Sequence, residues 1–336
     1  MFKLLAIIIT LLSFQALANE VNLYSAQKEY LIRPILNKFE KNTGIKVNMV
    51  TIDKSALISR LKNEGKNTPA DLVLTVDIGN IYQLKKNNLL QSVNSKIIKK
   101  QIPKYLRDPE NMWFGLTMSF RAIFYNKDKV AAGEIANYED LSDQKWRNSL
   151  LIRSSSNIYN QSLVASFLAH NGEEKTKKWL KSLVANMARS PQGGDSSQIK
   201  SLAAGEGKIA VANSYYFGKL TLDKGKIQNK LVKDKVKIIL PNQDNRGAHV
   251  NIRGGGVTKY AKNKENAIKL LEFLASDEAQ SFFANINFEY PVSKNIAIPD
   301  SIKKWGNNLK SDQINLEKIA KEQERAIYLM DKAGWR

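Results

Sequence analysis

Cysteine is absent from the 336 residues of this chain. Without thiols the protein can form neither disulfides nor thiolate metal sites, so its stability has to come from an ordinary packed core. Histidine is almost absent too, because the chain contains only His170 and His249, which lie far apart in the sequence. We therefore expect no zinc or copper site rich in imidazole, and any bound metal would be held mainly by oxygen.

An apolar run long enough to span a bilayer is also missing. The mostly apolar run Leu4 to Leu12 follows the charged residue Lys3 and precedes the small-residue end Ala16-Leu-Ala18. It is shorter than the roughly 20 residues that a membrane helix needs. The pattern is typical of a secretory signal peptide that is cleaved after Ala18. We therefore exclude residues 1–18 from the fold and expect a soluble, exported protein without a lipid anchor on cysteine.

Acidic residues are fewer than basic residues: the chain contains 32 Asp and Glu but 52 Lys and Arg, which gives a formal net charge of +20. Nucleic acid is the first partner that such a charge suggests. However, both signs alternate along the chain, as in residues 173–178 and 317–325, and there is no long basic tail and no zinc-finger or RNA-binding signature. We therefore favour a solvated basic surface over a nucleic-acid site.

Signatures of common enzyme classes are missing as well. The two histidines lie outside any HExxH or nucleophile-elbow pattern, and no glycine-rich phosphate loop occurs. Gly254-Gly-Gly256 lacks the GxGxxG spacing, and we expect it to be a hinge or a turn. The sequence therefore predicts a binding protein rather than an enzyme.

What the chain does contain is a regular alternation of strand and helix patterns. In residues 31–41, for example, apolar side chains follow the i, i+3, i+4 spacing of a helix. We expect strands at 20–24, 45–52, 69–75, 122–125, 150–153, 208–212 and 236–240. We expect helices at 31–41, 55–64, 81–86, 159–169, 173–185, 196–204, 263–275, 277–284 and over most of 299–336. This order predicts an α/β fold with a mostly parallel sheet and helices on both of its faces.

Several polar and aromatic side chains follow the predicted strands: Tyr24, Asp77, the loop 154–157 with Tyr159, and the pair Tyr215-Tyr216. Ligands of doubly wound folds bind at the carboxyl ends of strands, so these residues point to one cleft. Adjacent residues within a strand face opposite ways, but beyond its end the backbone can turn and the two phenols of the pair could converge. Core packing and a shared ligand both remain as explanations of the pair.

These segments resemble the periplasmic ferric-ion-binding proteins, which are the extracytoplasmic receptors of ABC-type iron importers. The most specific elements are Arg153-Ser-Ser-Ser-Asn-Ile-Tyr-Asn-Gln161 and Ala212-Asn-Ser-Tyr-Tyr216, found together. Weaker similarity is present at Tyr24-Ser25, Thr43-Gly44-Ile45, Thr68-Pro-Ala-Asp71, Thr75-Val-Asp77, His249-Val-Asn-Ile252 and Asn287-Phe-Glu-Tyr-Pro291. The resemblance covers essentially the whole chain after the signal peptide.

The resemblance implies a type II periplasmic-binding-protein fold, in which two α/β lobes are joined by hinge strands and close on a ligand in the cleft between them. We expect lobe 1 to comprise residues 19–120 plus 246–295 and lobe 2 to comprise residues 121–245 plus 296–336. It also implies a periplasmic, monomeric receptor that delivers its cargo to an inner-membrane ABC permease and binds no nucleic acid.

The resemblance gives Tyr159, Tyr215 and Tyr216 the role of iron ligands, all from lobe 2. Fe(III) is a hard, highly charged cation that prefers anionic oxygen donors such as phenolate. Free tyrosine has a pKa near 10, but a bound cation displaces the proton. Several tyrosines at one oxygen-rich site therefore favour ferric iron over ferrous iron and over zinc.

In lobe 1 the sequence departs from the family. Many relatives carry His, Tyr or Arg in the loop after the first strand, where this chain has Ala26-Gln27-Lys28-Glu29-Tyr30. Glu29 and Tyr30 are candidate additional ligands, although an acid at a helix N-terminus is equally well explained by the macrodipole. Relatives often complete the iron shell with carbonate or a similar synergistic anion. The candidate residues for holding such an anion here are Gln27, Lys28, Arg121 and Ser156.

Other interpretations compete with some of these roles. Arg121 would suit a planar carbonate through its fork of donors, but a surface salt bridge explains it equally well. We favour a cap or turn for Asp77 and a structural role for His249. For the whole protein the alternative is a receptor of the same fold for an organic cation or an oxyanion. The Tyr pair together with Tyr159 favours iron over both.

Overall fold

The computed structural model describes residues 19–222, 227–293, 295–306 and 309–336. The predicted signal peptide, residues 1–18, lies outside this part of the chain. Within the described ranges no helix is both long and apolar enough to cross a membrane.

Seven of the eight strands in the described part of the chain follow the predicted order, with differences in length, whereas the strand at Val250–Val257 was not predicted. The strands are β1 (Glu20–Ser25), β2 (Lys46–Thr51), β3 (Leu72–Val76), β4 (Phe114–Asn126), β5 (Leu150–Leu151), β6 (Ile209–Asn213), β7 (Val236–Ile239) and β8 (Val250–Val257). The helices are α1 (Arg33–Thr43), α2 (Lys54–Glu64), α3 (Ile78–Lys86), α4 (Lys96–Gln101), α5 (Ile158–Asn171), α6 (Glu173–Ala185), α7 (Asp195–Ala204), α8 (Ser214–Leu222), α9 (Ile227–Lys235), α10 (Lys264–Leu274), α11 (Asp277–Asn287), α12 (Asp300–Lys303), α13 (Leu316–Lys321) and α14 (Gln323–Lys332).

The strands form one mixed sheet in the order β2-β1-β3-β8-β4-β6-β5, and β7 pairs with β4. Strand β1 is parallel to β2 and β3, and β5 is parallel to β6. Strand β8 is antiparallel to both β3 and β4, and β4 is antiparallel to β6 and β7. The prediction of an α/β fold with helices on both faces is confirmed. The sheet was expected to be mostly parallel, but its middle is antiparallel because β8 and β4 run in opposite directions there.

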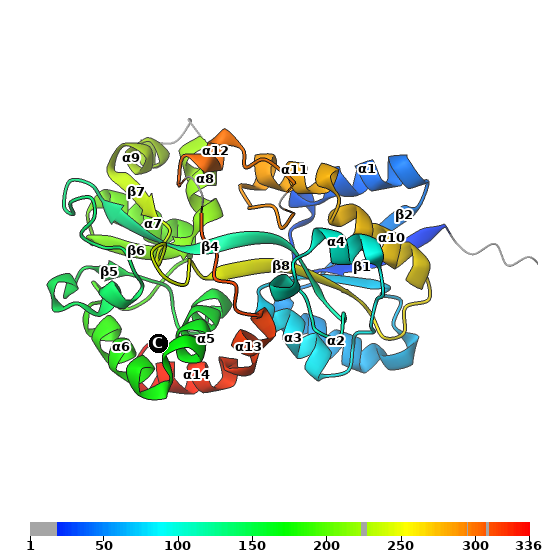
Figure 1. Ribbon diagram of the computed structural model, residues 1–336, viewed down its shortest axis with the longest axis horizontal. Helices are drawn as coiled ribbons and strands as arrows, with labels where there is room; N and C mark the ends of the chain where they lie inside the picture. Colours follow the sequence, from blue (N-terminus) through cyan, green and yellow to red (C-terminus); the bar gives the residue numbers. More distant parts are fainter. Residues whose placement is uncertain (1–18, 223–226, 294, 307–308) are drawn as a thin grey trace, which may run out of the picture.

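Figure 1 shows these two central strands running between two halves of the molecule. Strands β1 to β3 lie in one half with α1 to α4 and α10, and β5 to β7 lie in the other half with α5 to α9. Strand β4 pairs with β8 up to Phe120 and with β6 from Arg121 onward. The chain therefore passes from one half to the other inside a hydrogen-bonded strand.

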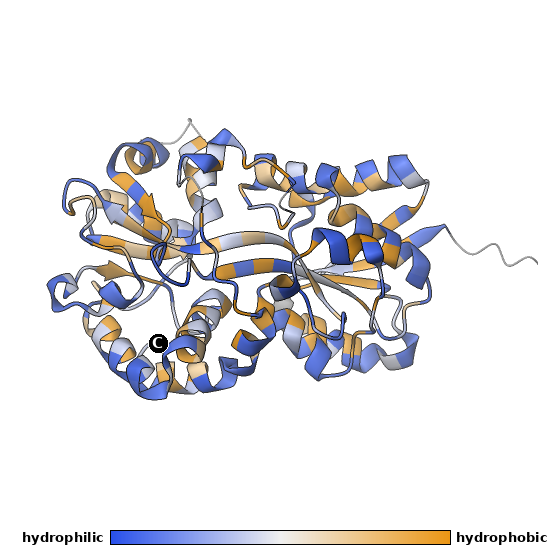
Figure 2. Cartoon of the chain, viewed as in Figure 1, coloured by the Kyte–Doolittle hydropathy of each residue, from blue (hydrophilic) through white to orange (hydrophobic). Residues whose placement is uncertain are grey.

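The core lies against both faces of this sheet. In α1, for example, Ile35, Leu36 and Phe39 are buried, as their helical spacing predicts. The helix ends at Gly44, which takes the left-handed conformation with a φ of 70°. Figure 2 shows the same division over the helices, with hydrophobic residues toward the sheet and hydrophilic residues outward.

Gly254-Gly-Gly256 does not form the expected hinge or turn, because it lies inside strand β8, which is buried along its whole length. Side chains would not fit at the second and third of these glycines. A Cβ at Gly255 would lie 2.8 Å from Cδ2 of Leu74, and a Cβ at Gly256 would lie 2.7 Å from the carbonyl oxygen of Met112. The glycines thus permit close approach of neighbouring chain segments rather than a reversal of direction.

The C-terminal helices contact both halves. Helix α13 packs against α3 and against α5, and α14 packs against α5 (Figure 1). Lys85 of α3 forms an ion pair of 3.2 Å with Glu317 of α13. The predicted helical tail is therefore a bridge beneath the junction of the two halves.

Candidate functional site

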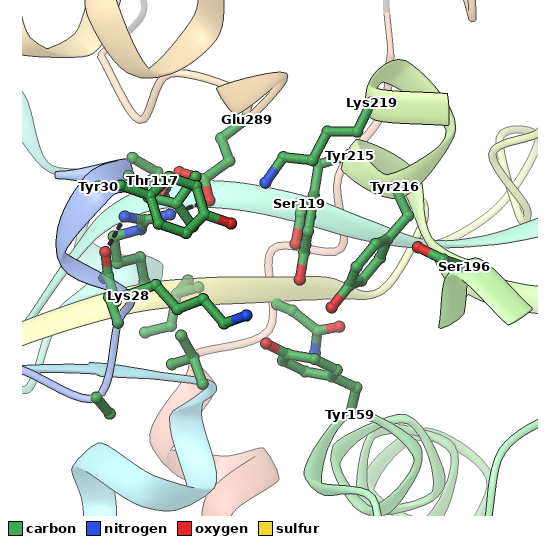
Figure 3. Close-up of a pocket in the computed structure, with 17 residues that line it drawn as sticks. Lys28, Tyr30, Thr117, Ser119, Tyr159, Ser196, Tyr215, Tyr216, Lys219 and Glu289 are labelled. Atoms are coloured by element: carbon green, nitrogen blue, oxygen red, sulfur yellow. Dashed lines mark hydrogen bonds and ion pairs between the residues drawn. The ribbon is translucent and has the colours of Figure 1, made fainter. Parts of the chain in front are cut away.

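A cavity of ≈ 350 Å³ lies at the junction of the two halves. One wall comes from the loop after β1 and the other from the first turns of α5 and α8, while β4 and β8 contribute the floor (Figure 3). The lining residues are Ala26, Gln27, Lys28, Tyr30, Leu31, Val76, Thr117, Ser119, Tyr159, Ser196, Tyr215, Tyr216, Lys219, Asn251, Ile252, Arg253 and Glu289.

The pair Tyr215-Tyr216 lies in the first turn of helix α8, which begins immediately after strand β6. The turn from strand to helix places both rings on the same side, with their centroids 4.2 Å apart. Both phenols point into the cavity (Figure 3). The expectation that the two side chains converge beyond a strand end is confirmed, although the helix itself was not predicted.

Tyr159 reaches the same point from helix α5, where it is the second residue. The residue is 9% exposed, and its hydroxyl faces those of Tyr215 and Tyr216 across the cavity (Figure 3). Three phenols from two helices therefore meet at one place.

Burial is the largest factor that raises the pKa of each of these three tyrosines above the ordinary value. The neighbouring phenol of Tyr216 raises the pKa of Tyr159 further, and the carboxylate of Asp195 does the same for Tyr216. The cavity therefore disfavours phenolates while it holds no cation. A bound metal ion would reverse this balance by attracting the negative charge.

In the part of the chain that the structure describes, carboxylate and imidazole ligands do not form an alternative metal site. Among the described residues no group of three or more His, Cys, Asp or Glu could hold a metal ion. Among the described residues, the hard metal donors that are grouped together are thus the phenol oxygens.

The opposite wall carries positive charge and amide groups. Lys28 extends across the cavity toward the phenols (Figure 3). Gln27 is buried and accepts a hydrogen bond from Arg253, while its Nε2 donor has no partner among the described residues. Arg253 also pairs with Glu289, whose carboxylate accepts a hydrogen bond of 2.9 Å from Thr117. The acid in this wall is therefore already neutralised, and Gln27 keeps a free donor.

The other site residues expected from the sequence differ in whether they line the cavity. Tyr30 lies at the rim of the cavity and is 69% exposed. Glu29 lies outside the lining and forms an ion pair of 2.7 Å with Arg33. Ser156 is exposed outside the lining, and its hydroxyl lies 3.1 Å from that of Ser154. Of the candidates for an anion, the structure brings Gln27 and Lys28 to the phenols but not Ser156.

Arg121 is fully buried beneath the cavity and is not part of its lining. It does form a salt bridge, at 3.0 Å to Asp195, but this bridge lies in the interior rather than on the surface. This buried position therefore matches neither of the two roles considered from the sequence, which were contact with an anion and a surface salt bridge.

Two further residues behave as structural elements. Asp77 caps helix α3, since its carboxylate accepts a hydrogen bond of 2.9 Å from the backbone of Gly79. His249 is buried, and burial lowers its pKa to about 3. Its ring nitrogen Nε2 lies 3.3 Å from the hydroxyl of Ser162, outside the cavity.

Sequence reasoning missed Lys219, Arg253 and Glu289 as cavity residues. Lys219 follows Tyr216 by three positions, so recognition of helix α8 would have placed it on the same face. Its Nζ lies 5.1 Å from the ring centroid of Tyr215, and burial lowers its pKa. Glu289 lies within a segment that resembles the ferric-ion-binding family, whereas Arg253 gave no signal that we can name.

Comparison with known proteins adds independent information. The family model described as bacterial extracellular solute-binding protein matches residues 67–320. The chain is 43% identical to iron uptake protein A1 of Synechocystis sp., over 94% of this chain and 88% of that protein. It is 26% identical to the major ferric iron-binding protein of Neisseria gonorrhoeae, over 94% of this chain and 93% of that protein.

Solved structures show the same similarity. The Trichodesmium protein IdiA (FutA), in complex with iron and citrate, has a TM-score of 0.91 and 45% identity, over 94% of this chain and all (100%) of that one. The ferric iron-binding protein A of Mannheimia haemolytica, in an open conformation, has a TM-score of 0.88 and 42% identity, over 95% and 99% of the two chains.

Proposed function

Since the chain belongs to the family of bacterial extracellular solute-binding proteins, we propose that it is a periplasmic receptor for ferric iron that binds the ion through the phenolates of Tyr159, Tyr215 and Tyr216. The observation that carries this proposal is the convergence of three phenols in one cavity, where the described residues form no accompanying cluster of acids or imidazoles. Fe(III) favours such hard anionic donors more strongly than Fe(II) or zinc does. The names of the relatives, which are iron uptake and ferric iron-binding proteins, support the same cargo.

The wall opposite the phenols supports binding of an anion together with the iron. Lys28 brings a positive charge, and Gln27 brings a donor without a partner among the described residues. A carbonate or a carboxylate ligand that occupied the remaining iron positions would meet both groups. The relative from Trichodesmium, which was solved with iron and citrate, is consistent with this arrangement. Tyr30 at the rim is the candidate for an additional protein ligand.

Capture then requires that the two halves approach each other. In our proposal lobe 1 (19–120 plus 246–295) closes on iron that the tyrosines of lobe 2 (121–245 plus 296–336) have bound. The closed form would be recognised by an inner-membrane ABC permease, and the receptor would act as a monomer. Reopening, loss of the anion or reduction of the iron would each weaken binding and permit release.

A receptor for an organic cation is less well supported by the cavity. Lys28 and Lys219 both line it, and the carboxylate of Glu289 is already paired with Arg253. An organic cation would need an aromatic box with unpaired acids.

The test is an ultraviolet-visible titration of the iron-stripped protein with chelated Fe(III), with and without bicarbonate. Tyrosinate bound to Fe(III) gives a visible charge-transfer band. We expect the band to saturate at one iron per chain and to be lost or strongly weakened in Tyr215→Phe and Tyr216→Phe. Tyr260→Phe, at an exposed site outside the cavity, is the matched control and should retain the band. Absence of a band in the wild-type protein would reject the proposal.

A further inference from the structure

Arg121 carries a buried positive charge directly beneath the three phenols. Its side chain is 0% exposed, and it extends from strand β4 where that strand changes partner from β8 to β6. Removing a guanidinium from water is costly unless its donors are satisfied by well-placed acceptors. The side chains that accept hydrogen bonds from Arg121 therefore indicate which segments this residue holds together.

Each of these acceptors belongs to a different segment of the cavity wall. Nη2 donates to the amide oxygen of Asn160 at 2.5 Å, and Asn160 directly follows Tyr159 in α5. Nη1 donates at 3.1 Å to the amide oxygen of Asn213, the last residue of β6, two positions before Tyr215. One guanidinium thus joins the two segments that carry all three phenols.

The third acceptor is the carboxylate of Asp195, the first residue of helix α7. Nη1 lies 3.1 Å and 3.0 Å from its two oxygens. Asp195 is itself buried, and it accepts a hydrogen bond of 3.3 Å from the backbone nitrogen of Asn213. The next residue, Ser196, lines the cavity. The ion pair therefore holds the start of α8 through two contacts to the preceding residue, Asn213: Arg121 bonds to its side chain and Asp195 bonds to its backbone.

We infer that Arg121 is the positioning residue of the site: it holds the starts of α5, α7 and α8 together so that Tyr159, Tyr215 and Tyr216 are preorganised for a metal ion. It contacts neither the ion nor an accompanying anion, because it lies outside the lining of the cavity. This inference rests on the proposed binding of iron by the three tyrosines. A planar fork with several donors suits this task better than the single ammonium group of lysine.

The distinguishing experiment is the same iron titration on Arg121→Gln and Arg121→Lys, each with and without bicarbonate. For Arg121→Gln we expect iron affinity to fall about 10- to 100-fold, the usual effect of removing a partner that orients metal ligands. We also expect a weaker or shifted charge-transfer band, because fewer phenolates reach the metal. Arg121→Lys should recover part of both, since one charged contact to Asp195 is retained. The loss should be equal with and without bicarbonate.

The matched control is Arg246→Gln, which breaks a partly buried ion pair of 2.6 Å with Glu139, away from the cavity. It should bind iron as the wild type does. If Arg121→Gln does not fold, as judged by circular dichroism, Asn160→Ala decides the matter. That variant removes one contact of the guanidinium, leaves the ion pair with Asp195, and should still weaken the band.

Several outcomes would overturn the inference. A folded Arg121→Gln protein with wild-type affinity and an unchanged band would do so, as would an unchanged band in Asn160→Ala when Arg121→Gln cannot fold. A loss that occurs only with bicarbonate would make Arg121 an anion contact instead. A wild-type protein that gives no band would overturn the ferric-receptor proposal as well, whereas a normal wild-type band with normal variants would overturn this inference alone.

Discussion

The carboxylate of Asp77 accepts a hydrogen bond of 2.8 Å from the hydroxyl of Ser162, across the junction of the two halves. Asp77 is the N-cap residue of helix α3 in one half, and Ser162 follows Tyr159 by three positions, about one turn, in helix α5 of the other. Asn251 of the central strand β8 donates to both groups, at 2.9 Å and 3.0 Å. A buried polar cluster therefore connects the helix that carries a phenol to the opposite half.

Ser162→Ala should weaken this connection. The variant removes a buried hydroxyl and leaves the Asn251 donor with one acceptor fewer, which costs about 1–3 kcal/mol. We expect a lower melting temperature and, if the contact helps to hold the closed form, iron affinity reduced by up to about tenfold. Small-angle scattering of the iron-loaded protein should then show a larger mean radius of gyration.

Ser166→Ala is the matched control for that experiment. Ser166 is also a buried serine of α5, but its hydroxyl contacts Asp312, at 3.4 Å, rather than the opposite half. It should lower the melting temperature without changing the scattering of the iron-loaded protein. An equal effect of both variants on iron affinity would show that the contact to Asp77 has no special role.

Iron binding should release protons and become weaker as the pH falls. The raised pKa values of Tyr159, Tyr215 and Tyr216 mean that all three phenols are protonated at neutral pH before iron binds. Each phenol that binds as phenolate must therefore lose a proton, so acid competes with the metal. A pH indicator in weak buffer should report one proton fewer per iron in Tyr216→Phe than in the wild type. The same proton count in both would contradict ligation by Tyr216.

His249 should make the folded protein sensitive to acid. Its pKa is about 3 in the folded state against 6.5 as the ordinary value, so between these values the unfolded chain binds the extra proton. Stability is then full above pH 6.5 and is lost as the pH falls toward 3, by about 1.4 kcal/mol per pH unit. Urea unfolding at pH 7 and pH 5 should show a smaller loss in His249→Gln. An unchanged loss would assign the acid sensitivity to other groups.

Gly218→Ala should disturb the helix that carries the Tyr pair. Gly218 lies in α8, and an added Cβ would overlap the ring of Phe288, which is buried and has a φ of 59°. Overpacking of this kind costs about 1–3 kcal/mol, more than the roughly 1 kcal/mol that alanine gains in a helix. We expect a lower melting temperature and weaker iron binding.

The control is Gly254→Ala in strand β8. A Cβ at Gly254 would meet Ile252 and Ile81 at 3.5 and 3.6 Å, which are ordinary contact distances. This variant should change neither stability nor binding strongly. Equal losses in both variants would mean that any added methyl group in the core is harmful, independent of α8.

Sequence patterns were sufficient for the fold class and for the convergence of the Tyr pair, because both depend on local periodicity and on the position of strand ends. Helix α8 was missed because its run Ser-Tyr-Tyr-Phe-Gly has no helical pattern of its own. Phe217 and Leu220 are buried within it, so tertiary packing stabilises this helix more than local preference does. The prediction of a binding protein rather than an enzyme is confirmed by the family to which the chain belongs.

Other features depend on contacts that a linear pattern does not contain. The side-chain acceptors of Arg121 lie 39, 74 and 92 residues away along the chain, so its buried position had no local signal. Gly255 and Gly256 of β8 are adapted to the packing of Leu74 and Met112, which are even more remote along the chain. The roles proposed for Gln27 and Lys28 remain predictions for the titrations described above.

Strand β4 joins the two halves without a loop, and it is buried except at Met118 and Tyr125, which are partly exposed. Movement of one half against the other must therefore bend or twist a paired ribbon rather than rotate a free segment. Such a ribbon behaves like a spring, because its resistance to bending rises as the two halves move farther from their resting positions. Its amides should exchange slowly with deuterium in both the empty and the loaded protein, and a protease should find no cleavage point there.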